Sequence, residues 1–128
     1  MDFVDGAKAR VGQAAAVLAA CLEQIDEYFR GRRKVFTLAL DLRGTDFQKA
    51  VWRELLKVSF GKTTSYGAIA RALGNGQAMR AVGGANRRNP VSIIVPCHRI
   101  VGADGSLTGY GGGLWRKEWL LAHERKQA

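Results

Sequence analysis

Cysteine and histidine are scarce in this 128-residue sequence, and their scarcity excludes several classes of protein. The two cysteines, Cys21 and Cys97, lie far apart and do not indicate a small secreted domain held together by disulfides. They fit a reducing compartment, and we expect the cytoplasm, with association to the nucleoid if the source is prokaryotic. Two cysteines and two histidines without close spacing do not form a structural zinc site, so we expect no metal.

Long apolar runs and acidic residues are also in short supply. The first residues, MDFVDG, carry two acids and no basic segment before an apolar core, so we expect no signal peptide and no membrane span. Only 11 Asp and Glu stand against 20 Lys and Arg, which gives a net charge of +9. This excess favours an anionic partner, most commonly nucleic acid. The alternative is that the charge only keeps the protein in solution.

The sequence is 47% apolar, enough for the core of one modest domain, and its first third predicts a helix and a strand. Residues 11–29 place apolar side chains at steps of three and four, which predicts one helix face with Cys21 as core filler at its edge. Residues 35–42, VFTLALDL, alternate as a half-buried strand does. Thr45–Gln48, TDFQ, is a capping box that begins the next helix.

Residues 65–88 have the pattern of a helix-turn-helix. Ser65 can cap a short helix, GNG at 74–76 predicts a tight turn, and QAMRAVGGANRR predicts a second helix. Gly83 and Gly84 cost about 1 kcal/mol each inside a helix relative to Ala. A helix surface made this bare lets its backbone approach something closely. Packing against another helix of the same protein is one explanation, but the surrounding arginines favour a nucleic-acid groove, and a narrow minor groove most of all.

The stretch SIIVPCHRIVG, residues 92–102, raises the question of chemistry. Ser92–Val95 is nearly all β-branched and predicts a buried strand that ends at Pro96. Cys97, His98 and a guanidinium then follow in a row. A small buried cysteine at a strand end is one interpretation, and a nucleophile with its proton acceptor is the other. Neighbours on an extended segment point to opposite sides, so a water or a bend would have to connect the thiol to the imidazole.

The last third predicts a turn, a glycine-rich run and a closing helix. Asp104 and Gly105 favour a hairpin or wing, and Tyr110 within GYGGG predicts a pocket wall with accessible backbone N–H groups. A relay through His98 would need a carboxylate to orient the imidazole, and Glu118 and Glu124 on the closing helix are the candidates.

Five blocks in consistent order, from about Thr45 to about Arg125, carry a family resemblance: SYGAIARALG, RAVGGANRRNP, PCHRIVG, GYGGG and KEWLLAHE. Together they resemble the O6-alkylguanine-DNA alkyltransferases, the methylated-DNA–protein-cysteine methyltransferases. The resemblance implies an irreversible, single-turnover DNA repair protein. It transfers an alkyl group from O6-alkylguanine, and also from O4-alkylthymine, in flipped-out duplex DNA to a cysteine. It needs no cofactor, because the lesion itself brings the alkyl group, and we expect a monomer.

The resemblance also implies roles for individual residues. Cys97 is the alkyl acceptor, His98 the base that reaches it through water, and Glu124 the carboxylate that orients His98. Tyr66 resembles the tyrosine that pushes on the target phosphate and donates a proton toward N3 of the departing guanine. Arg80 resembles the arginine that fills the vacated place in the base stack.

Further positions correspond to the DNA surface and the base pocket. Asn89 resembles the hinge between the recognition helix and the active-site segment, and Gly111 stands where relatives often have serine. The expected DNA contacts are Ser65, Ala78, Arg80, Ala81, Gly83, Gly84 and Arg87, with Arg88 adding charge beside them. The expected pocket comprises Asn86, Asn89, Ile100, Tyr110 and Gly111.

We therefore expect an α+β protein. Residues 43–128 would form the helical C-terminal DNA-binding and catalytic domain, with a helix-turn-helix, winged-helix-like core. Residues 1–42 would form a shortened N-terminal region of one helix and one strand, since family members usually carry a small sheet there. Two other functions stay open. One is a module that senses DNA damage without repairing it, although the non-catalytic branch has tryptophan where this chain has Cys97; the other is an unrelated cysteine hydrolase.

Overall fold

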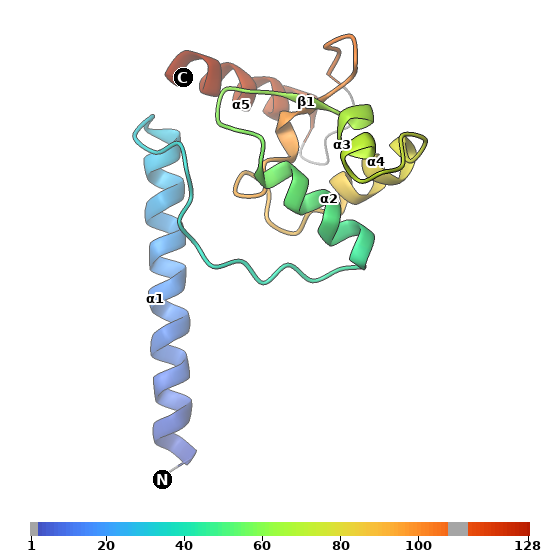
Figure 1. Cartoon of the computed structure of the whole chain (residues 1–128). Coiled ribbons are helices and arrows are strands. Elements are labelled where there is room, and N and C mark those ends of the chain that lie inside the picture. The colour runs from blue at the N-terminus through green and yellow to red at the C-terminus, as the bar shows by residue number, and fades with distance from the viewer. Residues whose placement is uncertain (1–2, 108–112) are drawn as a thin grey trace. The chain divides into compact units, whose positions relative to one another are not determined.

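The computed structural model describes residues 3–107 and 113–128, and it divides into two compact units, Met1–Leu40 and Asp41–Ala128 (Figure 1). The boundary predicted from the sequence was at residues 42/43. The first unit contains one helix, and the second contains the remaining helices and a small sheet. The fold is therefore a mixed α+β one, dominated by helices.

The first unit is built on the long helix α1 (Phe3–Phe29). Tyr28 is fully buried, with its ring centroid 5.3 Å from that of Phe29 and 5.7 Å from that of Phe36. The Gln24 amide exchanges hydrogen bonds with Thr37, accepting from its backbone N–H at 2.9 Å and donating to its hydroxyl at 3.1 Å. These contacts hold the segment after the helix against the last turns of α1, where Cys21 is half-buried.

The predicted strand at residues 35–42 is wrong. The segment runs as a coil between α1 and the next helix and pairs with no other strand among the described residues. The alternation of apolar side chains reflects partial burial, since Phe36 and Leu38 are half-buried while Val35 and Thr37 are exposed. Alternation alone cannot supply the partner strand that a ladder requires.

The second unit begins with α2 (Asp46–Leu56), and here the capping box is confirmed. The Thr45 hydroxyl accepts from the Gln48 N–H at 3.1 Å, and the Gln48 side chain accepts from the Thr45 N–H at 3.0 Å. Val51, Trp52 and Leu55 form the buried face of this helix. The indole of Trp52 donates to the carbonyl of Ala85 at 2.9 Å, which ties α2 to the recognition helix.

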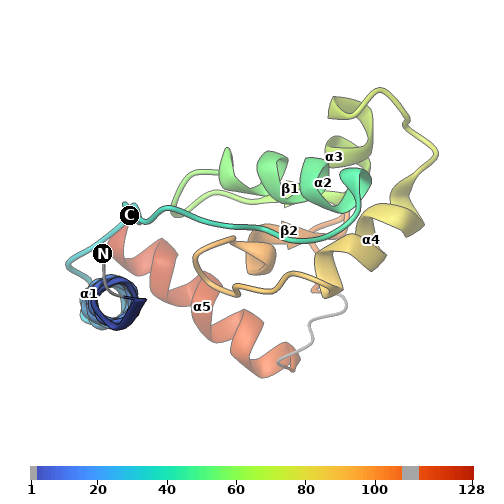
Figure 2. The same ribbon diagram turned by 90° about the horizontal axis from the view of Figure 1, so that it is seen from below.

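The helix-turn-helix is confirmed as α3 (Tyr66–Ala72) followed by α4 (Met79–Arg87), which pack against each other (Figure 2). The Ser65 hydroxyl caps α3 by accepting from the Ala68 N–H at 3.1 Å. Gly74 ends α3 with a φ of +79°, a left-handed conformation that glycine adopts without strain. The turn predicted from the sequence is therefore where α3 ends.

The predicted strand at Ser92–Val95 is also wrong. Ser92 and Val95 form only an isolated bridge, and Ile93 between them has a φ of +76°. The two-stranded parallel sheet lies elsewhere: β1 (Thr64–Ser65) pairs with β2 (Ile100–Val101), which follows Cys97 instead of preceding it. Ile94 and Val95 are buried without a ladder, so their β-branched side chains indicated burial and not pairing.

The segment after β2 makes a tight turn. The Gly102 N–H donates to the Ser106 carbonyl at 2.8 Å, and Gly105 has a φ of +83°. No second hairpin strand forms in the part described, up to Leu107, so the hairpin prediction holds only as a turn. The pocket positions Tyr110 and Gly111 lie outside the described residues. The closing helix α5 (Leu114–Gln127) buries Lys117, Leu120, Leu121 and Glu124.

Candidate active site

Cys97 is the first residue of a short 3-10 helix, η1 (Cys97–Arg99), whose three residues are all buried. Pro96 has no backbone N–H, and the Cys97 N–H turns back to the Val95 carbonyl at 2.8 Å, so the chain bends here instead of continuing as a strand. Cys97 is 4% exposed and carries a free thiol. The bend, which the sequence suggested as one way of linking thiol to imidazole, is the local geometry the structure adopts.

His98 points to the carboxylate of Glu124. Its Nε2 lies 2.6 Å from Glu124 Oε2, and both side chains are completely buried. Glu118, the other carboxylate considered on α5, is exposed. The second ring nitrogen of His98, Nδ1, is buried and has no hydrogen-bond partner among the described residues. A carboxylate that accepts from Nε2–H leaves Nδ1 as the acceptor of a neutral imidazole.

The electrostatic setting favours that neutral imidazole. Burial lowers the pKa of His98 below its ordinary value of 6.5, and the charges of Arg99 and Lys117 act in the same direction. Glu124 opposes this shift through its hydrogen bond and its charge without reversing it. His98 is therefore a free base at neutral pH, and it can accept a proton at Nδ1.

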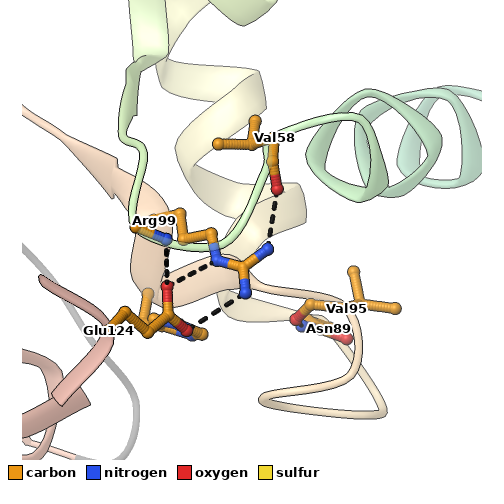
Figure 3. Close-up of polar contacts among 7 residues, drawn as sticks. Val58, Asn89, Val95, Arg99 and Glu124 are labelled. Atoms are coloured by element: carbon orange, nitrogen blue, oxygen red, sulfur yellow. Dashed lines mark hydrogen bonds and ion pairs between the residues drawn. The ribbon is translucent and has the colours of Figure 1, made fainter. Parts of the chain in front are cut away.

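Arg99 and Lys117 belong to this cluster, and the sequence reasoning assigned neither of them a role. Arg99 donates from Nε to Glu124 Oε1 at 2.8 Å and from a terminal nitrogen to Glu124 Oε2 at 3.1 Å (Figure 3). Lys117 is fully buried on α5; burial lowers the pKa of its amine, and the nearby Cys97 thiolate acts the other way. The signal was present, because Lys117 shares the helix face of Leu121 and Glu124 at steps of four and three.

Two asparagines join the end of the recognition helix to the cysteine segment. The Asn89 amide donates to the Val95 carbonyl at 2.7 Å and accepts from the Val91 N–H at 2.9 Å. The Asn86 amide, buried on α4, donates to the Cys97 carbonyl at 3.4 Å. Both residues therefore contact the backbone around Cys97. Ile100, at the start of β2, is fully buried next to this segment.

The recognition helix presents an exposed, basic and nearly bare surface. Arg80, Arg87 and Arg88 are exposed. Among the described residues, a Cβ added at Gly84 would meet nothing within 4 Å, so this glycine does not serve packing against any of the helices described. At Gly83 it would approach the Tyr66 ring at 3.7 Å, an ordinary contact. This tyrosine, the first residue of α3, is half-buried beside α4.

The remaining predicted DNA-contact positions differ in how open they are. Ala81 is exposed and Ala78 half-buried, at and just before the first turns of α4. Ser65 is half-buried, and its hydroxyl is already engaged as the cap of α3. Only its remaining hydrogen-bonding capacity is therefore open to a partner.

The sequence profile of the 6-O-methylguanine DNA methyltransferase DNA-binding domain matches residues 46–126. This range covers most of the second unit and contains η1, the helix-turn-helix and the buried His98–Glu124 pair. The chain belongs to this family. Within the described residues, no helix is long and apolar enough to cross a membrane.

Curated relatives of the family carry the name methylated-DNA–protein-cysteine methyltransferase. One from Mycolicibacterium paratuberculosis is 54% identical over 110 residues, which span 86% of this chain and 67% of the relative. One from Methanosarcina acetivorans is 54% identical over 79% of this chain and 65% of its own length. The similarity therefore extends across bacterial and archaeal members.

Solved structures of two other proteins are similar to this fold. A crystal structure of Mycobacterium tuberculosis OGT in complex with DNA superposes with a TM-score of 0.84 at 53% identity, covering 86% of this chain and 68% of the other. S. pombe Atl1, in complex with damaged DNA containing O6-carboxymethylguanine, gives a TM-score of 0.56 at 29% identity over 65% of this chain and 79% of its own. Both structures are complexes of family folds with DNA.

Proposed function

We propose that this protein repairs alkylated DNA by direct reversal, transferring the alkyl group of O6-alkylguanine irreversibly to Cys97. O4-alkylthymine is the second substrate class. The observation that carries the proposal is the buried cysteine directly beside a His98–Glu124 pair, in a chain about 53% identical to relatives named for this transfer. The protein acts as a monomer on duplex DNA, in the cytoplasm.

The chemistry is a displacement at carbon. Nδ1 of His98, the buried acceptor, takes the proton of the Cys97 thiol through one bridging water, and Glu124 stabilises the imidazolium that forms. The thiolate sulfur then forms a bond to the alkyl carbon while the bond between that carbon and O6 breaks. The electron pair leaves with guanine, which Tyr66 protonates at N3. No proton is lost or gained overall, because the Tyr66 phenolate recovers its proton from the relay or from solvent.

DNA recognition is assigned to α4. Its small residues, among them Ala78, Ala81, Gly83 and Gly84, let the helix backbone enter the minor groove, with Ser65 at the start of α3 beside the strand. Arg80 occupies the gap left when the target base rotates out. Arg87 and Arg88, both exposed, neutralise phosphates.

Backbone groups of the protein form the pocket for the flipped base. The pocket is assigned to the backbone groups of Cys97, Ile100 and Gly111, with the ring of Tyr110 as one wall. Asn89 and Asn86 are the links by which α4, once docked on DNA, fixes the position of the Cys97 segment. This assignment predicts that docking and chemistry are coupled through two amide side chains.

Intact-mass measurement tests the proposal. A thioether on Cys97 has no good leaving group, and no second thiol lies near Cys97 in the sequence, so each molecule should gain one methyl, about 14 Da, and then stop. The protein is mixed with a duplex carrying O6-methylguanine, and peptide mapping locates the adduct. A burst equal to the protein concentration, with the adduct on Cys97, supports the proposal. Continuous turnover, or an adduct on Cys21, contradicts it.

A second function, damage sensing without repair, is favoured by one observation: the resemblance to Atl1, whose structure holds damaged DNA. The same experiment separates the two. A sensor would bind the O6-methylguanine duplex more tightly than undamaged duplex and leave its own mass unchanged. Transfer of the methyl group to the protein excludes pure sensing.

A further inference from the structure

Glu124 is shared by two cationic or protonatable side chains. Oε2 lies 2.6 Å from His98 Nε2 and 3.1 Å from a terminal nitrogen of Arg99, while Oε1 accepts from Arg99 Nε at 2.8 Å. The Gly61 N–H adds a fourth, longer contact to Oε1 at 3.4 Å. The carboxylate thus faces a fork of two parallel N–H donors on one side and the imidazole on the other, a strong and directional arrangement.

Arg99 is itself held in place from the opposite side. Its other terminal nitrogen donates to the Val58 carbonyl at 2.7 Å (Figure 3). Its guanidinium also lies 5.8 Å from the centre of the Phe60 ring. Both anchors belong to the loop between α2 and β1. The guanidinium is therefore fixed between this loop and α5, and it fixes the Glu124 carboxylate in turn.

The charge of Arg99 affects whether His98 stays unprotonated. A buried His98–Glu124 pair alone would carry one negative charge with His98 neutral, and a low dielectric penalises an isolated buried charge heavily. Such a pair would take up a proton and hold it, which would occupy the imidazole as a base. The positive charge of Arg99 cancels that of Glu124, so His98, Glu124 and Arg99 together carry no net charge while His98 is unprotonated.

We propose that Arg99 is a positioning residue of the transfer reaction: by forking onto Glu124 it keeps the carboxylate ionised and aimed at His98, and it keeps His98 free to accept the proton of Cys97. The kinetic part of this inference rests on the proposed function. The charged groups that act on His98 are Arg99, on η1, and Glu124 and Lys117, on α5. Removing Arg99 leaves Lys117 as the remaining cation of the set.

The first test needs no transfer activity and leaves the buried cluster unsubstituted. The chain has two histidines, so the imidazole signals of His98 and His123 can be followed by NMR from pH 5 to 9, with His123→Gln to assign them. We expect His98 in the intact protein to titrate below the ordinary value of about 6.5. A His98 that stays protonated through pH 7 overturns the inference, whether or not the protein transfers methyl groups.

The second test compares Arg99→Gln with Arg99→Lys, and takes Arg53→Gln, an exposed arginine of α2, as the matched control. Single-turnover transfer from an O6-methylguanine duplex is measured across the same pH range. In the glutamine variant the acidic limb of the pH–rate profile should move up by about one unit, so the rate should fall about tenfold at pH values well below the pKa of His98 and by no more than a few fold at pH 7. The lysine variant keeps the positive charge, so the acidic limb of its pH–rate profile should lie where that of the unsubstituted protein lies. The control should match the unsubstituted protein.

The outcomes are separable. A rate that falls equally at every pH, with the titration of His98 unmoved, makes Arg99 a structural residue and overturns the inference. If Arg99→Gln does not fold, Arg99→Lys still tests the inference: its acidic limb should match that of the unsubstituted protein, and a limb that moves up by a unit or more overturns the inference. If the unsubstituted protein transfers nothing, the proposed function fails, while the titrations of His98 in the variants still test Arg99.

Discussion

The arginines of the second unit differ in whether their side chains have partners within the protein. Arg99 is buried, and its guanidinium contacts Glu124, the Val58 carbonyl and the Phe60 ring. Arg80 and Arg87 on α4, and Arg88 directly after it, are exposed, and their side chains make no hydrogen bond or ion pair within the part of the chain that the structure describes. The same residue type is thus fixed in one place and left open in the other.

The difference follows from what each region has to do. A relay of protons needs atoms fixed within a few tenths of an ångström, and buried charges are tolerated there only when each has a partner. A surface that meets DNA needs cations free to pair with phosphates, since a cation already paired inside the protein has less to gain. The substitutions below separate these two regions.

The largest effect is expected from Cys97→Ala. This change removes the sulfur nucleophile and should abolish transfer, while affinity for duplex DNA stays nearly unchanged because it rests on α4 and phosphate contacts. Intact mass reports transfer, and fluorescence anisotropy with labelled duplex reports binding. If affinity fell together with transfer, the two regions would not be separable as described.

Glu124→Ala should be the most damaging change to stability. It leaves Arg99 buried and unpaired, and breaking a buried pair in this way costs about 3–5 kcal/mol of unfolding free energy. Glu118→Ala, on the exposed side of the same helix, is the matched control and should change the free energy by less than about 0.5 kcal/mol. Urea denaturation monitored by circular dichroism measures both. Equal losses would mean that the Arg99–Glu124 contact contributes little.

Local chemistry made the helices of the second unit predictable. The side chains of Thr45 and Gln48 each accept a hydrogen bond from the other's backbone N–H. Ser65 caps α3, and Gly74 takes the left-handed conformation that ends this helix. Each of these features depends on residues only a few positions apart. The segments at 35–42 and 92–95 failed for the opposite reason, because a strand depends on a partner that the segment itself does not encode.

The site was predictable in part. The residues alone left Glu118 and Glu124 open as partners of His98, and the family resemblance favoured Glu124. The fold brings the Glu124 carboxylate to the imidazole and leaves Glu118 exposed. A role for Arg99 could not be predicted from the sequence, because its hydrogen-bond partners, Glu124 and Val58, lie 25 and 41 positions away. Long-range partners of a buried charge are set by packing, which a local pattern does not contain.

On the DNA side, the largest effect is expected from Arg80→Ala. Without a side chain to fill the vacated place in the stack, the flipped state loses part of the compensation for unstacking, which is worth a few kcal/mol per base step. We expect transfer from duplex DNA to slow by about tenfold or more, and transfer from a single strand to change much less. Single-turnover rates on both substrates test this. A duplex rate equal to that of the unsubstituted protein would remove Arg80 from the role of wedge.

The smallest effect is expected from Arg88→Ala. If this exposed side chain neutralises one phosphate, its loss should weaken binding to undamaged duplex modestly at low salt, by a similar factor for different sequences. It should also reduce the slope of log affinity against log salt by about 0.9. Lys57→Ala is the control, because the Lys57 amine already pairs with Glu54 at 2.7 Å on α2 and should leave the slope unchanged. A slope that is the same in all three proteins would show that Arg88, although exposed in the free protein, contacts no phosphate when DNA binds.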